Sequence, residues 1–167
     1  MAYELEFEQW LPVVPEKVFQ FFADPRNLPL ISPPDNDVRV LGARLVSRES
    51  AEPDLKFLIS FRPLPSLPFL RLRWTVLITD FESGKSFRDV QLAGPFKRWE
   101  HSHDFPAVTR DGREGTLIRD RIRYELALPL LGGIANALCV RPRLKKMFAA
   151  RHKATEELLV SQGQPAG

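Results

Sequence analysis

The sequence has a single cysteine, Cys139, and no long run of hydrophobic residues. One cysteine excludes an internal disulfide framework and is typical of proteins from a reducing compartment. The longest charge-free stretch, residues 126–140, contains Pro129, Gly132 and Gly133, and it is shorter than the roughly 20 apolar residues that cross a bilayer. The first ten residues carry acids where a secretory signal carries bases. These absences predict a cytoplasmic protein.

An excess of charge of one sign is also lacking, since 24 basic residues are balanced by 21 acidic ones. This balance, without any nucleic-acid-binding motif, predicts that nucleic acid is not a partner. Basic side chains do gather near the C-terminus, at Arg141, Arg143, Lys145, Lys146, Arg151 and Lys153. They fit the solvated face of a helix, or a patch for anionic lipid headgroups during transient membrane contact.

The length and the hydrophobic fraction of 44% are those of one globular domain. We expect a single ligand-binding domain over residues 1–160, followed by a flexible tail over 161–167. A domain of this size has enough apolar residues for a core and for an internal cavity. No feature of the sequence indicates the oligomeric state.

Hydrophobic periodicity divides the chain into strands, two short helices and one long helix. Residues 3–11 alternate as a strand, 15–23 begin with a proline that starts a helix, and Asp24-Pro25 caps a second short helix. Further strands with a period of two are expected at 38–46, 54–62, 69–81, 85–93, 96–106 and 114–126. Short turns between them predict an antiparallel meander.

The chain changes to a helical pattern after Gly132-Gly133. Residues 134–160 are expected to form one helix, which Pro142 kinks or breaks in its first turns. An antiparallel sheet needs cover on its apolar face, and only this helix is long enough to supply it. The pattern therefore predicts an α+β fold, in which a curved antiparallel sheet of about seven strands wraps the C-terminal helix and leaves a cleft for a ligand.

One segment carries a family resemblance, and it reads FRDVQLAGPFKRWEHSHDF over residues 87–105. It is similar to the strand-turn-strand of uncharacterised bacterial members of the SRPBCC superfamily, in which F-x-D-x-Q, G-P-F and W-x-H-x-H-x-F follow in that order. Gly115-Thr116, Asp120, Tyr124 and the terminal helix extend the resemblance over nearly the whole chain. It implies the helix-grip fold of START and polyketide cyclase/dehydrase-like proteins. That superfamily includes lipid carriers, cyclases and hormone-binding proteins, so the resemblance assigns no catalytic residue.

Alternation places one set of side chains on the inner face of the expected sheet, and the apolar stripe of the helix adds two more. We expect these residues to line the ligand cavity: Phe57, Leu72, Trp74, Val76, Phe87, Trp99, His101, His103, Phe105, Asp120, Ile122, Tyr124, Leu138 and Phe148. The sequence does not decide whether Asp89 and Gln91 also face the cavity, because Val90 and Leu92 compete for the inner face.

A carboxylate and two histidines on an apolar face need partners, because an unpaired buried charge is costly. We expect Asp120 to pair with His101 or His103 across adjacent strands. Three roles stay open: the pair fixes strand register, it orients a polar end of the ligand, or it works as a general acid and base. No metal and no cofactor is expected, because the H-x-H pattern has no further histidine or cysteine in the sheet.

These patterns predict a protein that binds, transports or senses a small hydrophobic molecule, and the resemblance implies that this molecule is of a lipid, polyketide or terpenoid type. Two proline-stiffened apolar segments, 62–70 and 28–31, are candidate lids over the cavity. One alternative is a cyclase- or dehydratase-like enzyme that uses His101, His103 and Asp120. The other is a protein-interaction domain with a vestigial cavity.

Overall fold

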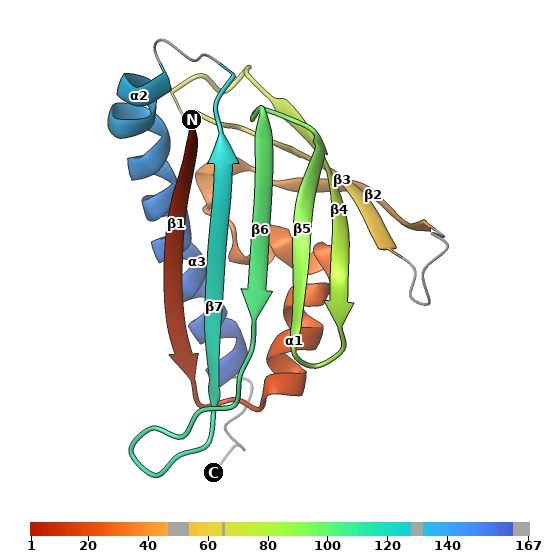
Figure 1. Ribbon diagram of the computed structural model, residues 1–167, viewed down its shortest axis with the longest axis vertical. Helices are drawn as coiled ribbons and strands as arrows, with labels where there is room; N and C mark the ends of the chain where they lie inside the picture. The colour runs from red at the N-terminus through yellow and green to blue at the C-terminus, as the bar shows by residue number, and fades with distance from the viewer. Residues whose placement is uncertain (47–53, 65, 128–131, 162–167) are drawn as a thin grey trace.

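The computed structural model describes residues 1–46, 54–64, 66–127 and 132–161 (Figure 1). The predicted flexible tail lies outside the described residues from 162 onward. The elements, in chain order, are β1 Ala2–Leu11, α1 Pro15–Ala23, η1 Pro25–Ile31, η2 Pro34–Asn36, β2 Arg39–Val46, β3 Asp54–Phe61, β4 Leu72–Glu82, β5 Ser86–Ala93, β6 Arg98–Asp104, β7 Thr116–Glu125, α2 Gly132–Ala135, η3 Asn136–Val140 and α3 Arg141–Ser161. The predicted α+β class is confirmed.

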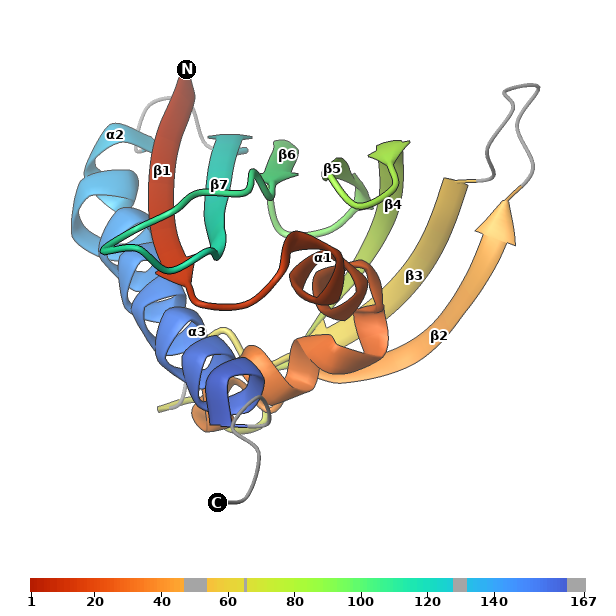
Figure 2. The same ribbon diagram turned by 90° about the horizontal axis from the view of Figure 1, so that it is seen from below.

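The described strands form one seven-stranded antiparallel sheet in the order β1-β7-β6-β5-β4-β3-β2. Consecutive strands from β2 to β7 are neighbours, which confirms the predicted meander. The first strand adds to the far edge, beside β7, with Phe7 opposite Asp120. The sheet is strongly curved, and its concave side holds α1 and α3 (Figure 2).

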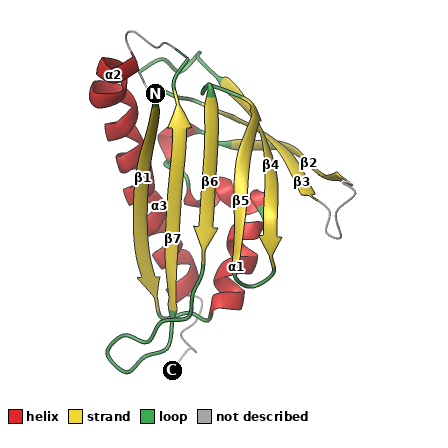
Figure 3. Cartoon of the chain, viewed as in Figure 1, coloured by secondary structure: helices red, strands yellow, loops and turns green. Residues whose placement is uncertain are grey.

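The convex face of the sheet at β1 and β7 is polar because acids on one strand stand opposite bases on the other. These exposed pairs are Glu8–Arg119, Glu6–Arg121 and Glu4–Arg123, with N–O distances of 2.9, 3.1 and 3.4 Å. Exposed ion pairs stabilise a fold by only about 0–1 kcal/mol each. Because side chains alternate along a strand, the residues between these charges face the helices, which lie on one side of the sheet (Figure 3).

The core on the concave side has two parts. One lies under α1, where the rings of Phe19 and Phe22 meet Phe105 at 5.8 and 5.5 Å between centroids. The other lies under α3, where Phe148 is fully buried and stacks on Phe7 at 4.3 Å. The two parts hold the two ends of the helical layer against the same sheet.

The C-terminal helical segment differs in its first turns from the single helix predicted over 134–160. Residues Asn136–Val140 are π-helical, and α3 begins at Arg141 with Pro142 in its first turn. Pro142 has no N–H to bond a carbonyl of the preceding turn, and the π-helical turn directly before it changes the hydrogen-bond register there. The helical segment runs on without a gap from Gly132 to Ser161, so Pro142 lies at a change from π- to α-helical winding rather than at a break.

Several strands begin one to three residues later than predicted, and hydrogen bonds explain two of these differences. The expected strand 69–81 starts at Leu72, because tight turns join the Leu67 and Leu70 amides to carbonyls three residues earlier. The expected strand 96–106 starts at Arg98, because the Gln91 side chain bonds both backbone groups of Phe96 and holds that segment as a turn.

Candidate functional site

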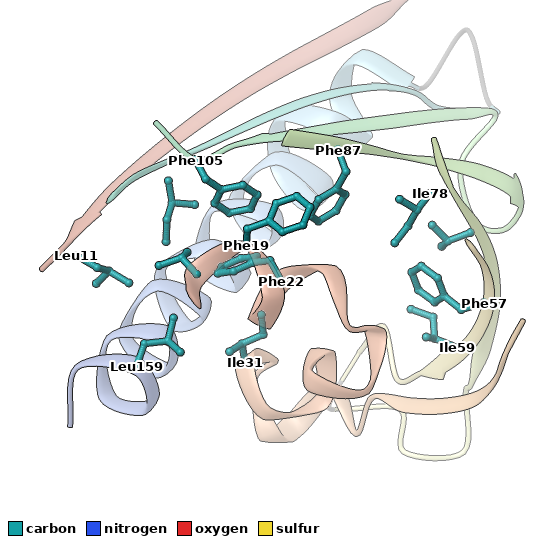
Figure 4. Packing of buried hydrophobic residues seen from close by; sticks show 13 residues of the cluster. Leu11, Phe19, Phe22, Ile31, Phe57, Ile59, Ile78, Phe87, Phe105 and Leu159 are labelled. Carbon is teal, nitrogen blue, oxygen red and sulfur yellow. The ribbon is translucent and has the colours of Figure 1, made fainter. Parts of the chain in front are cut away.

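A cavity of about 140 Å³ lies between the concave face of the sheet and the helical layer. Strands β3 to β6 supply one side, and α1, η1, η2 and α3 supply the other. Figure 4 shows Phe57, Ile59 and Ile78 on β3 and β4, facing Phe22 and Phe87. The lining is mostly aromatic and aliphatic, which is the composition of a small-molecule pocket.

Most of the predicted cavity residues lie at this cavity. Those that line it are Phe57, Trp74, Val76, Phe87, Trp99, His101, His103 and Phe148. Phe105, Asp120, Ile122 and Tyr124 are buried outside the lining. The reason is that α1 covers Phe105, and the α3 residues Leu144 and Phe148 cover Ile122 and Tyr124.

Two further predicted cavity residues lie outside the lining and, unlike those four, are not buried. Leu72 is half-buried and lies outside the lining. Leu138 is 73% exposed, and Ile134, expected on the same face, is 63% exposed. The spacing of an α-helical face does not apply here, because a π-helix closes its hydrogen bonds over five residues and turns each side chain by a smaller angle.

The prediction of cavity residues from strand alternation left out most of the residues that the helices contribute. Phe22, Leu28 and Ile31 from α1 and η1 line it, and so do Met147 and Arg151 from α3. The sequence does carry a signal for Phe22, on the apolar face of the helix that Pro15 starts. Of the two candidate lids, the segment 28–31 contributes to the lining, whereas the described residues of 62–70 do not.

The polar wall of the cavity is a cluster of two aspartates and two histidines on β5, β6 and β7. Strand pairing places Asp89 opposite His101 and His103 opposite Asp120. The Asp120 carboxylate lies 2.9 Å from His101 Nε2 and 2.8 Å from His103 Nδ1. The Asp89 carboxylate lies 3.2 Å from His101 Nδ1 and 3.1 Å from His103 Nε2. Each imidazole therefore lies between both carboxylates.

Two of these four close contacts between imidazole nitrogens and carboxylate oxygens are hydrogen bonds. His101 Nε2 donates to Asp120 Oδ1, and His103 Nε2 donates to Asp89 Oδ2. The second oxygen of Asp89 accepts from the Trp99 indole at 3.1 Å. The predicted Asp120–histidine pair is confirmed, and the undecided Asp89 faces the cavity. Gln91 lies outside the lining and bonds the β5–β6 turn instead.

Charge in the cluster is stabilised by its own members. Burial favours neutral Asp89, but the charge of His101 and the hydrogen bonds of both histidines outweigh it and hold the pKa of Asp89 well below its usual range. Burial also opposes the charge on Asp120, and the hydrogen bonds of the same histidines keep its pKa well below 3.8. Burial lowers the pKa of His101, but the Asp89 charge and the Asp120 hydrogen bond raise it above 6.5. The cluster is thus an ionic network in an apolar surrounding.

Apart from His103 Nδ1, which lies beside Asp120, two nitrogen donors at the cavity have no hydrogen-bond partner among the described residues. They are the indole nitrogen of Trp74 and Nε of Arg151. The Arg151 guanidinium lies over the rings of Phe22 and Phe148, at 5.2 and 5.5 Å from their centroids. An unsatisfied buried donor costs about 1–3 kcal/mol, so an acceptor brought by a ligand would be bound favourably at either position.

The remaining candidate groups lie away from the cavity. Cys139 is exposed on the π-helical segment, and most of the basic cluster at 141–153 is exposed on α3. Only Arg151 of that cluster lines the cavity. Among the described helices, none combines the length and the apolar character that a membrane crossing requires. Contact of the basic cluster with lipid headgroups stays a prediction.

Solved structures with the same arrangement of elements identify the fold. The protein TTHA0849 from Thermus thermophilus aligns over 97% of this chain and 100% of its own, with a TM-score of 0.67 and 21% identity. A START superfamily protein from Mycobacterium smegmatis aligns over 95% and 98%, with a TM-score of 0.64 and 14% identity. The chain has the helix-grip fold. The resemblance to this fold expected from residues 87–105 is therefore confirmed.

A third helix-grip structure is the Zhui aromatase/cyclase from Streptomyces sp. R1128. It aligns over 98% of this chain and 100% of its own, with a TM-score of 0.62 and 13% identity. No protein-family model matches the sequence, and no curated protein sequence matches it. Identities of this size establish the common fold alone, so the function has to be argued from the cavity.

Proposed function

We propose that this protein binds a small aromatic molecule in the cavity between the sheet and α3. The observation that carries the proposal is the cavity itself, about 140 Å³ in volume and lined by Phe22, Phe57, Trp74, Phe87 and Phe148. A dry apolar cavity of about 150 Å³ holds one benzene ring in an engineered protein. The cavity thus has room for one ring, or for the ring end of a longer molecule.

The unpaired donors beside the cavity specify the polar part of this ligand. A hydroxyl or carboxylate on the ring would accept from the Trp74 indole or from Arg151, which have no partner among the described residues. The apolar remainder would lie against β3 and β4. The name of one similar structure, the Zhui aromatase/cyclase, supports an aromatic ligand in a helix-grip cavity.

Binding is favoured over acid–base catalysis by the position of the imidazole nitrogens. Every ring nitrogen of His101 and His103 lies within 3.2 Å of a carboxylate oxygen. A general acid or base needs a proton-transfer site within hydrogen-bond reach of the ligand. These nitrogens are directed toward Asp89 and Asp120 instead.

Two ring compounds of matched size test the proposal. We expect toluene and p-cresol to bind with one site each and to shift the Trp fluorescence and the melting temperature. We expect p-cresol to bind about tenfold more tightly, because its hydroxyl satisfies a buried donor worth about 1–3 kcal/mol. In Trp74→Phe, which removes the indole N–H, that preference should shrink toward equality.

A matched pair of substitutions on β4 tests whether the ligand binds in the cavity. Val76 lines the cavity, whereas its neighbour Leu77 is buried but lies outside the lining. Val76→Phe should fill the space and abolish toluene binding, and Leu77→Phe should leave it unchanged. Absence of binding in the wild-type protein, with no small molecule co-purifying in native mass spectrometry, would favour the interaction domain with a vestigial cavity.

A further inference from the structure

Asp89, His101 and His103 converge at the cavity wall in the manner of metal ligands. One ligand atom from each of the three residues lies within 4.8 Å of the others. We propose that these three residues bind a divalent transition-metal ion, which differs from the expectation from sequence that no metal is bound. That expectation rested on the absence of a further histidine or cysteine in the sheet, and the structure places the Asp89 carboxylate beside the two histidines.

The distances already present fit a coordination sphere. Asp89 Oδ2 lies 3.2 Å from His101 Nδ1 and 3.1 Å from His103 Nε2. Two ligand atoms at about 2.0–2.2 Å from a common ion lie roughly 2.8–3.6 Å apart in octahedral or tetrahedral geometry. Two of the three separations between ligand atoms therefore already match those around an ion, and the third is within 4.8 Å.

The groups behind these ligands occupy the positions of an outer coordination shell. Metal-binding histidines usually donate their second ring N–H to a carboxylate, which fixes the ring. Asp120 has that role at His101, whose Nε2 donates to its Oδ1 at 2.9 Å, and the same oxygen lies 2.8 Å from His103 Nδ1, so a small rotation of that ring would form the second bond. The Trp99 indole donates to Asp89 Oδ1 and leaves Oδ2 directed toward both histidines.

The access to the cluster and its charge both place the proposed metal ion on the Asp89 side. Asp89, His101 and His103 line the cavity, whereas Asp120 is 1% exposed and lies outside the lining. The cavity leaves coordination positions open on that side. One divalent ion would balance the charges of Asp89 and Asp120, with both imidazoles neutral, in a region where unbalanced charge is costly.

The ligand set selects the class of metal. Two imidazoles and one carboxylate suit Zn²⁺, Fe²⁺ and Co²⁺, whereas Mg²⁺ and Ca²⁺ prefer sites built from oxygen alone. The proposal does not depend on the aromatic ligand, because its tests use metal ions alone.

Titration of EDTA-stripped wild-type protein with Co²⁺ at neutral pH is the first test. We expect one Co²⁺ per chain, with visible d–d absorption, displaced by Zn²⁺ and unaffected by excess Mg²⁺. The sequence contains only three histidines, so NMR of ¹⁵N-histidine-labelled protein identifies the ligands. The large contact shifts of directly coordinated rings should appear at His101 and His103, and His152 should show only smaller through-space shifts. Absence of one-to-one binding, or ligation by His152 alone, would overturn the proposal.

Substitutions distinguish the three metal ligands from Asp120, which positions them. Asp89→Asn, His101→Gln and His103→Gln should each weaken Co²⁺ binding at least about tenfold, and Asp120→Asn should weaken it about 10–100-fold while keeping the stoichiometry. His152→Gln is the matched control and should bind as the wild type does. Circular dichroism reports whether each variant is folded. If a variant is unfolded, its result is set aside and the titration of the wild-type protein decides whether the proposal holds. Unchanged binding in a folded His101→Gln/His103→Gln protein would contradict it.

Discussion

The two walls of the cavity are held together by different forces. The wall on β3 and β4 is apolar, and Phe57, Ile59 and Ile78 pack there by contact alone. The wall on β5 and β6, with Asp120 behind it on β7, is an ionic network in which each charge has its partners on neighbouring strands. Apolar packing tolerates a change of volume, whereas a buried charge depends on its partner. The polar wall should therefore be rigid, and the apolar wall should set the size of the ligand.

The largest expected effect is on the polar wall, in Asp120→Asn. Removing one partner of a buried ion network costs about 3–5 kcal/mol, so the free energy of unfolding in urea should fall by about that amount. Toluene binding should stay within about twofold of the wild type, because Asp120 lies outside the cavity lining. Unchanged stability combined with lost binding would contradict the division between the two walls.

On the apolar wall, Ile78→Ala is expected to change which ligands bind, in contrast to Asp120→Asn. This residue is buried and lines the cavity, so its truncation should cost about 2–4 kcal/mol and enlarge the space. Naphthalene, too large for the wild type, should then bind. Ile118→Ala is the control, since Ile118 is fully buried away from the cavity. It should lose similar stability without admitting naphthalene, and admission by both variants would argue against a size-selective apolar wall.

A smaller effect is expected at Tyr124, which lies beyond both walls under the π-helical segment. Its hydroxyl donates to the buried Asn136 side chain. Tyr124→Phe removes that bond and should lower the free energy of unfolding by about 1 kcal/mol, with faster amide exchange at Asn136–Val140. Tyr3→Phe, a half-buried neighbour whose ring lies 5.5 Å away, is the control and should leave exchange there unchanged. Slow exchange in Tyr124→Phe would mean that the hydroxyl does not anchor this segment.

Much of the polar wall was predictable because alternation in a strand is strict. Asp120, His101 and His103 each occupy an otherwise apolar face, and a charge in that position requires a partner nearby. Asp89 was not predictable, because both faces of its strand carry apolar residues. Only the pairing of Asp89 with His101 across β5 and β6 settles its direction.

The helical half of the cavity was harder to predict for two reasons. Periodicity within one element does not tell which other element it meets, so Phe22 and Arg151 were recognised as helical without being placed at the cavity. The π-helical segment also shifts the face of the helix, which is why Leu138 is exposed. The strands and α1 follow local rules, whereas the composition of the cavity depends on how those elements are arranged in space.

The smallest expected effect concerns a cluster of arginines around Asp37, at the start of β2 and next to the apolar wall. Asp37 has a left-handed backbone with φ of 39°, and its Oδ2 lies 2.8 Å from Arg39, 2.6 Å from Arg71 and 3.2 Å from Arg62. The hydrogen bonds of Arg39 and then Arg71 lower the pKa of Asp37 from 3.8 to about 2. This carboxylate therefore ties β2 to the chain around β3 and β4.

Because the pKa of Asp37 is lower in the folded protein than in the unfolded chain, its contribution to stability is present above about pH 4 and is lost as the pH falls toward 2. The side chain is 25% exposed, so salt screens the effect and keeps it small. Urea unfolding of the wild type and of Asp37→Asn should differ slightly at pH 6, and the difference should shrink with acidification and with added salt. Asparagine suits the comparison because it tolerates the left-handed backbone while removing the charge. A difference that stayed constant with pH would mean that it does not come from the charge of Asp37, and the arginine cluster would then have no part in holding the apolar wall.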